Sequence, residues 1–184
     1  ITSTNYIFND VFINNSNTND STYQIKLVVQ AGGAGILPCT DTITHNLTVF
    51  PKPLADFNIA IGNQCAPACD TITDLSIHNI NSPITWNWTI SASNSTYPAN
   101  PDSSNSQDTI ICFPDNQSGS DIIYDINLII KDTLSNIGCS DTITKNITIY
   151  SRPVANFDTL YSCKPDSACA GDSIIFIDMS SGQS

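Results

Sequence analysis

Apolar and polar residues alternate along much of this chain, and the alternation predicts β-strands. Apolar residues recur at every second position between clusters of turn-forming residues, a spacing that places them on one face of a strand. The segment "YDINLIIKD", residues 124–132, shows the pattern most clearly. The same criterion predicts further strands at 55–61, 71–79, 85–91, 108–113 and 141–150. Residues 92–107 are rich in Ser, Asn and Pro and are expected to form a loop.

The last of these strands carries one polar residue on its apolar face. Ile143, Ile147 and Ile149 alternate inward, but Lys145 occupies the position between them. An inward charge of this kind indicates an edge strand or a bulge. We also expect the aromatic residues Trp88 and Phe57 to be buried in the core.

A second pattern is a repeat with a period of 100 residues. The sequence "PCTDTITHNLTVFPKPLADF" (38–57) returns as "GCSDTITKNITIYSRPVANF" (138–157), with ten of twenty positions identical. His45 thus corresponds to Lys145. In both copies a Phe precedes by eleven residues a Tyr that opens an alternating strand. Further along, "LSIHNINS" (75–82) aligns with "IIFIDMSS" (174–181), and a cysteine pair precedes each segment.

The register of the repeat predicts three structural units. Residues 1–50 are expected to be the C-terminal half of one domain, 54–150 a complete domain, and 154–184 the N-terminal part of a third. Short strands at this density predict an all-β fold of tandem immunoglobulin-like β-sandwiches. The two joints, "FPKPLADF" and "YSRPVANF", are short and contain proline, so neighbouring units are expected to move little against each other.

Composition narrows the classes of partner. The formal net charge is −11, which disfavours binding to nucleic acid or to an anionic membrane surface. No apolar run approaches the length that spans a membrane, so membrane insertion is not expected. Hydrophobic residues make up 40% of the chain, enough to build a core.

Several of these residues resemble one known family. Pro-x-Ala-x-Phe at the start of a unit, Trp88, "YDINL" and the closing "GCSDTIT" resemble PKD-type immunoglobulin-like domains. "CAP" at 65–67, taken with "GCSDT", is similar to the tandem PKD-like arrays of large cell-surface proteins of gliding bacteria. The chain departs from the family at the Trp-x-Phe-Gly-Asp-Gly pattern, because "TISAS" (89–93) follows Trp88. Properties of that turn are therefore not transferred.

The resemblance implies a function. It implies spacer repeats of a long extracellular, cell-surface adhesin exported by the type IX secretion system and serving attachment or gliding motility. The expected partners are neighbouring repeats of the same chain, with surface polysaccharide or other cell-surface proteins as further possibilities. The alternative is a carbohydrate-binding accessory module of a secreted hydrolase, which an exposed aromatic platform would favour.

Seven cysteines are expected to form disulfides in an oxidising compartment. Cys112 closes one strand at the pole where the loop before residue 71 lies, so we expect it to bond to Cys65 or to Cys69. Cys139 begins a strand at the opposite pole, and its partner stays open. The pairing that the resemblance implies joins the "CAP" cysteine to the "GC" cysteine; the other option is a neighbouring unit.

The sequence offers no catalytic centre, and we expect no enzyme activity. The two histidines, His45 and His78, occupy non-equivalent positions of the repeat, and no known nucleophile, phosphate-loop or zinc-protease motif occurs. No cofactor is expected, with calcium as the one alternative. Its candidate ligands are carboxylates in or beside loops, namely Asp70, Asp74, Asp102 and Asp108.

A short motif also points to modification. The triplet Asp-Ser/Thr-aliphatic occurs eight times and resembles the O-glycosylation signal of exported proteins in the same bacterial group. The candidate hydroxyls are Thr42, Thr71, Thr109, Thr133, Thr142, Thr159, Ser167 and Ser173. Because Ile143 is expected to face inward, Thr142 should point to solvent.

Overall fold

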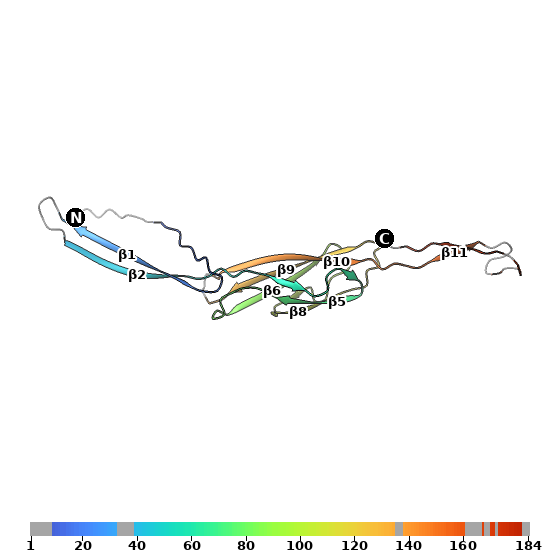
Figure 1. Ribbon diagram of the computed structural model, residues 1–184, viewed down its shortest axis with the longest axis horizontal. Helices are drawn as coiled ribbons and strands as arrows, with labels where there is room; N and C mark the ends of the chain where they lie inside the picture. Colours follow the sequence, from blue (N-terminus) through green and yellow to red (C-terminus); the bar gives the residue numbers. More distant parts are fainter. Residues whose placement is uncertain are drawn as a thin grey trace. The chain divides into compact units, whose positions relative to one another are not determined.

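The computed structural model describes residues 9–32, 39–134, 138–160, 167, 170–171 and 173–181. Every regular element among them is a β-strand, so this part of the chain is all-β, as the alternation predicts (Figure 1). In the same residues, no helix has the length and apolarity needed to cross a membrane.

Two sheets form from residues 54–150, which we call the middle repeat. The first is antiparallel, in the order β3-β5-β8, and comprises Phe57–Ile59, Ala68–Asp74 and Thr109–Phe113. The second has the order β4-β10-β9-β6-β7 and comprises Gln64–Cys65, Ser140–Tyr150, Ile122–Asp132, Ile84–Ala92 and Ser103–Ser104. Within it, β4 runs parallel to β10.

The flanking segments form two-stranded antiparallel sheets. In the first repeat, residues 9–50, Ser21–Ala31 (β1) pairs along its whole length with Cys39–Val49 (β2). In the third repeat, residues 154–181, Phe157–Leu160 (β11) pairs with Ile175–Asp178 (β12). Each of these segments therefore contributes one strand pair.

The predicted strands at 85–91, 108–113, 124–132 and 141–150 are present as β6, β8, β9 and β10, with bounds shifted by one or two residues. The other two differ more. The strand expected at 55–61 is shortened to β3, and the one expected at 71–79 begins earlier and ends at Asp74, as β5. The expected loop at 92–107 contains β7, which pairs with β6.

Ser76 explains why the ladder between β3 and β5 does not extend further. Its hydroxyl lies 3.1 Å from the backbone nitrogen of Asp56 and 3.2 Å from the Asp56 carbonyl oxygen. A side chain therefore satisfies both backbone groups that a regular ladder would pair with another strand. Pairing resumes one residue further on, as a bridge between Leu54 and Ile77.

The core of the middle repeat lies between its two sheets. Phe57 on β3 contacts Trp88 on β6 edge-on, with ring centroids 5.2 Å apart, and Phe113 on β8 contacts Tyr124 on β9 at 4.6 Å. All four side chains are buried, which confirms the prediction for Trp88 and Phe57. On β9 and β10 the burial alternates residue by residue, so each strand presents one face to this core.

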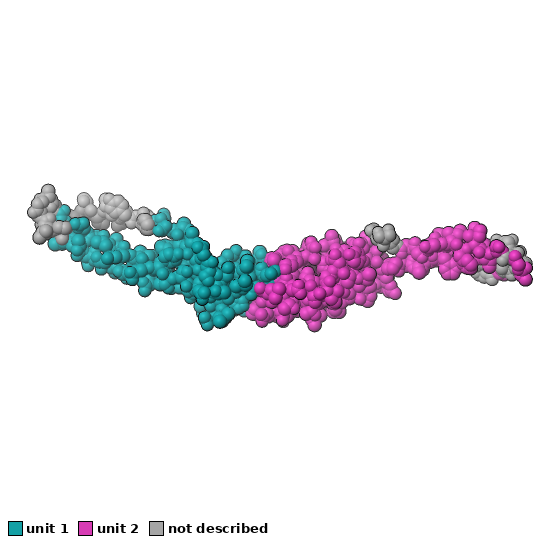
Figure 2. Space-filling model, viewed as in Figure 1, with its two compact units in different colours: residues 1–56, 76–85, 130–142 teal, residues 57–75, 86–129, 143–184 magenta. Residues whose placement is uncertain are grey.

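The chain forms two compact units, shown in Figure 2. One comprises residues 1–56, 76–85 and 130–142, and the other comprises residues 57–75, 86–129 and 143–184. Both contain part of the middle repeat. The domain boundaries expected from the repeat register, at 50–54 and 150–154, stay predictions.

Candidate functional site

The segments that follow the two joints make the same backbone hydrogen bonds, each within its own repeat. At the first, the amide of Leu54 donates to Ile77 and the amide of Ile77 donates back, at 2.8 and 2.9 Å. At the second, Val154 and Ser181 exchange the same two bonds at 2.7 and 2.9 Å. Ser180 also repeats the role of Ser76, because its hydroxyl contacts the backbone nitrogen and oxygen of Asn156, both at 3.1 Å.

These equivalences correct one alignment. Residues 75–82 do not correspond to 174–181, because the hydrogen bonds equate Ser76 with Ser180. The strand pairing agrees: Phe57 faces Asp74 across its ladder, and Phe157 faces Asp178. The period is 100 residues at β11 but 104 at β12, so the third repeat carries four extra residues between its first two strands.

An ion pair holds the first joint. The Lys52 ammonium lies 2.8 Å from Asp141 Oδ1, and the amide of Ala55 donates to Asp141 Oδ2 at 2.9 Å. Asp141 is the acid of an Asp-Thr-Ile triplet at the start of β10, so the joint is attached to the strand on which the repeat ends. The bond from Lys52 lowers the pKa of this carboxyl most, and the Ala55 amide lowers it further against the opposing effect of burial.

The two joints differ in the donor that binds one carboxylate, because the first joint has a proline where the second has a serine. Ser151, at the second joint, donates its backbone N–H to Asp121 at 2.9 Å. Its counterpart at the first joint is Pro51, which has no N–H to donate. Asp20, the counterpart of Asp121, instead accepts a bond of 3.1 Å from the amide side chain of Asn79 in the middle repeat. Losing one local donor therefore leaves this carboxylate available to the following repeat.

A buried asparagine closes the turn before β9, and the first repeat has an equivalent asparagine before β1. The Nδ2 group of Asn116, a fully buried residue, donates to the carbonyls of Ser120 and Ile149, at 2.8 and 3.1 Å, while its Oδ1 accepts from the Ser118 amide. Asn14 makes the matching bonds in the first repeat. The sequence analysis did not predict these asparagine hydrogen bonds, although each Asn begins an Asn-x-Ser triplet and such residues are common in turns.

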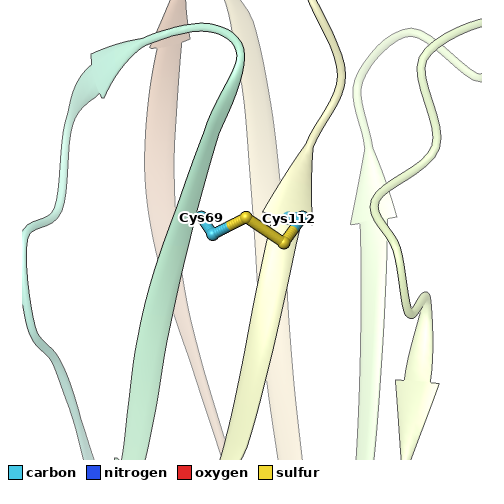
Figure 3. Close-up of a disulfide and its surroundings, with 2 residues drawn as sticks. All are labelled: Cys69 and Cys112. Carbon is cyan, nitrogen blue, oxygen red and sulfur yellow. A yellow bond between two sulfur atoms is a disulfide. The ribbon is translucent and has the colours of Figure 1, made fainter.

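The structure bonds Cys112 to Cys69, one of the two partners that the sequence left open. Figure 3 shows the bridge joining neighbouring strands. The two residues face each other in the β5–β8 ladder, whereas Cys112 exchanges its backbone bonds with Asn100 on its other side. The pair therefore occupies a non-hydrogen-bonded position, where side chains lie closest. Cys69 is exposed, so the bridge lies on the outer face of the sheet.

Three other cysteines have free thiols. Cys65 is exposed at the end of β4, Cys39 is exposed at the start of β2, and Cys139 is half-buried just before β10. Neither option for the partner of Cys139 is realised among the described residues. Cys163 and Cys169 lie outside them.

The four candidate calcium ligands have hydrogen-bond donors of their own. Buried Asp70 accepts the amides of Ile61 and Gly62, at 2.8 Å for the shortest bond. The other three accept as well: Asp74 from Trp86 Nε1 at 2.8 Å, Asp102 from Ser103 and Asp108 from the Asp74 amide. In the described part of the chain, no three acidic, His or Cys side chains gather to hold a metal. Calcium binding stays a hypothesis, and thermal unfolding with and without calcium tests it.

Most candidate hydroxyls of the Asp-Ser/Thr-aliphatic triplets reach solvent. Thr109 and Thr159 are half-buried, and the exposed residues are Thr42, Thr71, Thr133, Thr142, Ser167 and Ser173. Ile143 is half-buried beside exposed Thr142, as the alternation predicts. The acids of these triplets also have local structural roles. Asp41 and Asp158, for example, each accept the amide of the following Thr at 2.8 Å.

Most aromatic side chains in the described part of the middle repeat are buried or half-buried, so few could form an exposed platform for binding carbohydrate. Trp88 is buried and donates from Nε1 to the carbonyl of Ser106 at 2.8 Å, and half-buried Trp86 donates to Asp74. Burial raises the pKa of Tyr124, which keeps the phenol protonated so that it donates to the Tyr97 carbonyl at 2.7 Å. Tyr150 is exposed over 41% of its surface.

The inward lysine of β10 belongs to the core packing. The Lys145 ammonium lies 4.9 Å from the centroid of the Phe57 ring and donates to the Phe57 carbonyl. Aromatic contact and a carbonyl acceptor explain how the strand tolerates a charge on its apolar face. His45 occupies the equivalent position of β2 in the first repeat. This equivalence favours a structural role for His45.

Comparison with models of protein families, with curated proteins and with solved structures gave no match for this chain.

Proposed function

We propose that this chain is a spacer segment of a long extracellular, cell-surface adhesin, built from tandem PKD-type immunoglobulin-like domains and without catalytic activity. The bonded first joint is the observation that carries the proposal. Lys52 in the joint pairs with Asp141 of the middle repeat, and the side-chain amide of Asn79 in the middle repeat donates to Asp20 of the first repeat. Bonds of this kind restrict movement between neighbours, which suits a chain that holds another part away from a surface.

One further observation supports an extracellular place. The Cys69–Cys112 disulfide lies on the outer face of its sheet, and exposed disulfides persist in oxidising surroundings. On the resemblance, the proposal extends to export by the type IX system and to attachment or gliding motility.

Two experiments in the native host test this function. Antibodies against the chain should label intact cells, and labelling that requires permeabilised cells would count against a surface location. Removing residues 54–153 preserves the 100-residue register and should leave attachment or gliding intact if the repeat is a spacer. Loss of attachment by cells that still display the shortened protein would instead assign a binding role to the middle repeat.

We also propose O-linked glycans on the triplets, first on Thr142 and Thr42 and then on Thr71, Thr109 and Thr133; all of these are exposed except Thr109, which is half-buried. Charged residues are only 12% of the sequence, so charge protects the exposed strands poorly against proteases and edge-to-edge association. The intact mass of protein from its own host should exceed the sequence mass by hexose-sized increments. Thr142→Val should remove one increment or chain, and a mass equal to that of the bare sequence would exclude the glycans.

A further inference from the structure

Two free cysteines of the middle repeat lie at opposite ends of β10. Cys65, the last residue of β4, faces Tyr150, the last residue of β10, in the parallel ladder. Cys139 immediately precedes the first residue of β10. Eleven residues separate Cys139 from Tyr150, which at about 3.3 Å per residue is roughly 36 Å. A disulfide needs Cα atoms about 4.4–6.8 Å apart, so Cys65 and Cys139 of one repeat are too distant to bond to each other.

Cys139 lies beside the joint with the preceding repeat. Asp141, two residues further on, binds the Lys52 ammonium of that joint at 2.8 Å and the Ala55 amide at 2.9 Å. Alternation places the side chains of Cys139 and Asp141 on the same side of the chain, and both residues are half-buried. The carbonyl of Cys139 also accepts the amide of Asp132 on β9 at 2.9 Å, which holds the backbone in place. Cys139 is therefore on the side of the chain that contacts the joint.

Cys65 lies beside the joint with the following repeat. The residue that it faces, Tyr150, is followed directly by residues 151–153 of the second joint. Arg152, which corresponds to Lys52 of the first joint, stands two residues after Tyr150. The thiol of Cys65 is exposed, so it is open to a partner. The middle repeat thus presents one free cysteine at each of its two joints.

The 100-residue register brings both kinds of cysteine to the same joint. Phe50, at the end of the first repeat, corresponds to the residue that Cys65 faces, so a cysteine that repeats Cys65 in the first repeat lies beside Phe50. Phe50 stands two residues before Lys52, and Lys52 contacts Asp141, two residues after Cys139. Two extended residues advance about 7 Å. The two cysteines therefore lie on either side of one ion pair, at short distances from it.

We propose that a disulfide crosses each joint of the array, from the cysteine equivalent to Cys65 in one repeat to the cysteine equivalent to Cys139 in the next. The inference rests on the proposed tandem array, because the partners of Cys65 and Cys139 then belong to neighbouring repeats of a longer chain. Both kinds of cysteine recur in the sequence: Cys39 repeats Cys139, and Cys163 begins the same Cys-x-Pro motif as Cys65. The Cys69–Cys112 bridge stays within its own repeat.

Each bridge forms by oxidation of two thiols. The thiols release two protons and two electrons as the S–S bond forms, and the disulfide of an oxidised thiol oxidoreductase accepts the electrons and becomes a dithiol. The exposed thiolate of Cys65 attacks that disulfide, and the thiolate of the neighbouring repeat then displaces the oxidoreductase from the mixed disulfide. Neighbouring repeats are thereafter held by two covalent connections, the joint and the bridge, which restricts bending at the joint.

Peptide mapping without reductant on the full-length protein from its own host tests the proposal. Free thiols are alkylated first, and digestion with pepsin in acid prevents disulfide exchange. The Cys139 peptide should be linked to a Cys-x-Pro peptide of the preceding repeat, and the Cys65 peptide to a cysteine of the following repeat that precedes an Asp-Ser/Thr-aliphatic triplet. The linked Cys69–Cys112 peptide is the internal control. Alkylated Cys65 and Cys139 would overturn the bridge, and surface labelling of the same cells decides separately whether the spacer function also fails.

Duplicating the middle repeat separates bridges between repeats from bridges within one repeat. Inserting a second copy of residues 54–153 after residue 153 keeps the 100-residue register and places Cys65 of the first copy and Cys139 of the second copy at one joint. After oxidation, mapping should recover one linked Cys65–Cys139 peptide. Cys65→Ser in the first copy should abolish that peptide, whereas Cys65→Ser in the second copy, the matched control, should leave its yield unchanged. A linked peptide that survives either variant at half yield would show a bridge within each copy and overturn the proposal, as would its absence from the unmodified duplicated chain.

Discussion

At the scale of single residues, carboxylates and amides hold turns and joints that the apolar pattern does not specify. Asp141 binds an ammonium and an amide at the first joint, and Asp70 binds two amides of the loop after β3. Asn116 closes a turn with three backbone groups. Each of these side chains satisfies backbone groups that would otherwise lack partners on leaving water.

Asp141→Asn should destabilise the middle repeat by about 0.5–1.5 kcal/mol at pH 7, because a partly exposed ion pair is lost and the bond to the Ala55 amide weakens. The folded-state pKa of Asp141 lies below its ordinary value, so its contribution is complete above the unfolded pKa of about 4. It is lost as pH falls through the lowered folded value. Urea unfolding followed by tryptophan fluorescence measures the difference.

At pH 2, the difference in urea midpoint between Asp141→Asn and the unmodified chain should therefore be smaller than at pH 7. Asp125→Asn, on the exposed face of β9, is the control and should change stability little at either pH. A difference between Asp141→Asn and the unmodified chain that persists unchanged at pH 2 would rule out the ionised carboxylate as its cause.

Asn116→Ala should destabilise the middle repeat by about 1–3 kcal/mol, because the substitution leaves the buried carbonyl of Ile149 without this donor. The same change at Asn14 is the matched control, since Asn14 makes the equivalent bonds in the first repeat. Tryptophan fluorescence reports only the middle repeat, so Asn14→Ala should shift the transition by less than about 0.5 kcal/mol. Equal shifts of the unfolding transition in the two variants would show that the hydrogen bonds of each asparagine do not act only on their own repeat.

At the scale of elements, the exposed disulfide joins two strands without taking part in the core. Cys69 and Cys112 close a segment with a sequence separation of 43, which contains β6 and β7. Alternation keeps the neighbours Asp70 and Ile111 on the buried face. The bridge thus restricts the conformational freedom of the unfolded chain, while other residues pack the inner face of the sheet.

Replacing both cysteines by serine should leave a folded middle repeat that is less stable by about 2–4 kcal/mol, the range for a disulfide closing a segment of this length. Calorimetry or urea unfolding measures the loss, and peptide mapping without reductant should recover the Cys69–Cys112 pair from the unmodified chain. Cys65→Ser is the control, because Cys65 is exposed with a free thiol. Equal stability of the double variant and the unmodified chain would contradict a stabilising role for the bridge.

At the scale of the whole molecule, the sequence carries a large excess of negative charge. The sequence holds 17 acidic and 6 basic residues, and its isoelectric point is about 4.1. Like charges repel one another within the folded chain, which opposes its compact state. The strength of this repulsion should depend on ionic strength.

Raising the salt concentration from about 20 to about 300 mM shortens the screening length from roughly 20 to roughly 6 Å. Repulsion among the excess acidic groups should therefore weaken, and the middle repeat should unfold at a higher urea concentration. Urea unfolding followed by tryptophan fluorescence at both salt concentrations checks this. Lower stability at high salt would show that ion pairs such as Lys52–Asp141 outweigh the repulsion between like charges.

The sequence by itself determined the strands, because alternation is a local property that a single strand expresses wherever it pairs. It also revealed the repeat, the buried Trp88 and the outward direction of Thr142. It could not supply partners across the fold. The choice of Cys69 over Cys65 follows from the register of β5 against β8, and the short β4 and β7 carry too few residues to show a pattern.

Only the tertiary structure decided what the polar residues do. Asp141 is the acid of one of several Asp-Ser/Thr-aliphatic triplets, and the sequence does not distinguish it from the others. Its bond to Lys52 forms because the start of β10 lies beside the first joint, although the two residues are 89 positions apart in the sequence. The four extra residues of the third repeat were likewise identified from hydrogen bonds, because Ser180 makes the bonds in that repeat that Ser76 makes in the middle repeat. Hydrogen bonds between distant segments depend on how the strands are placed in space, and that placement follows from the packing of the whole core.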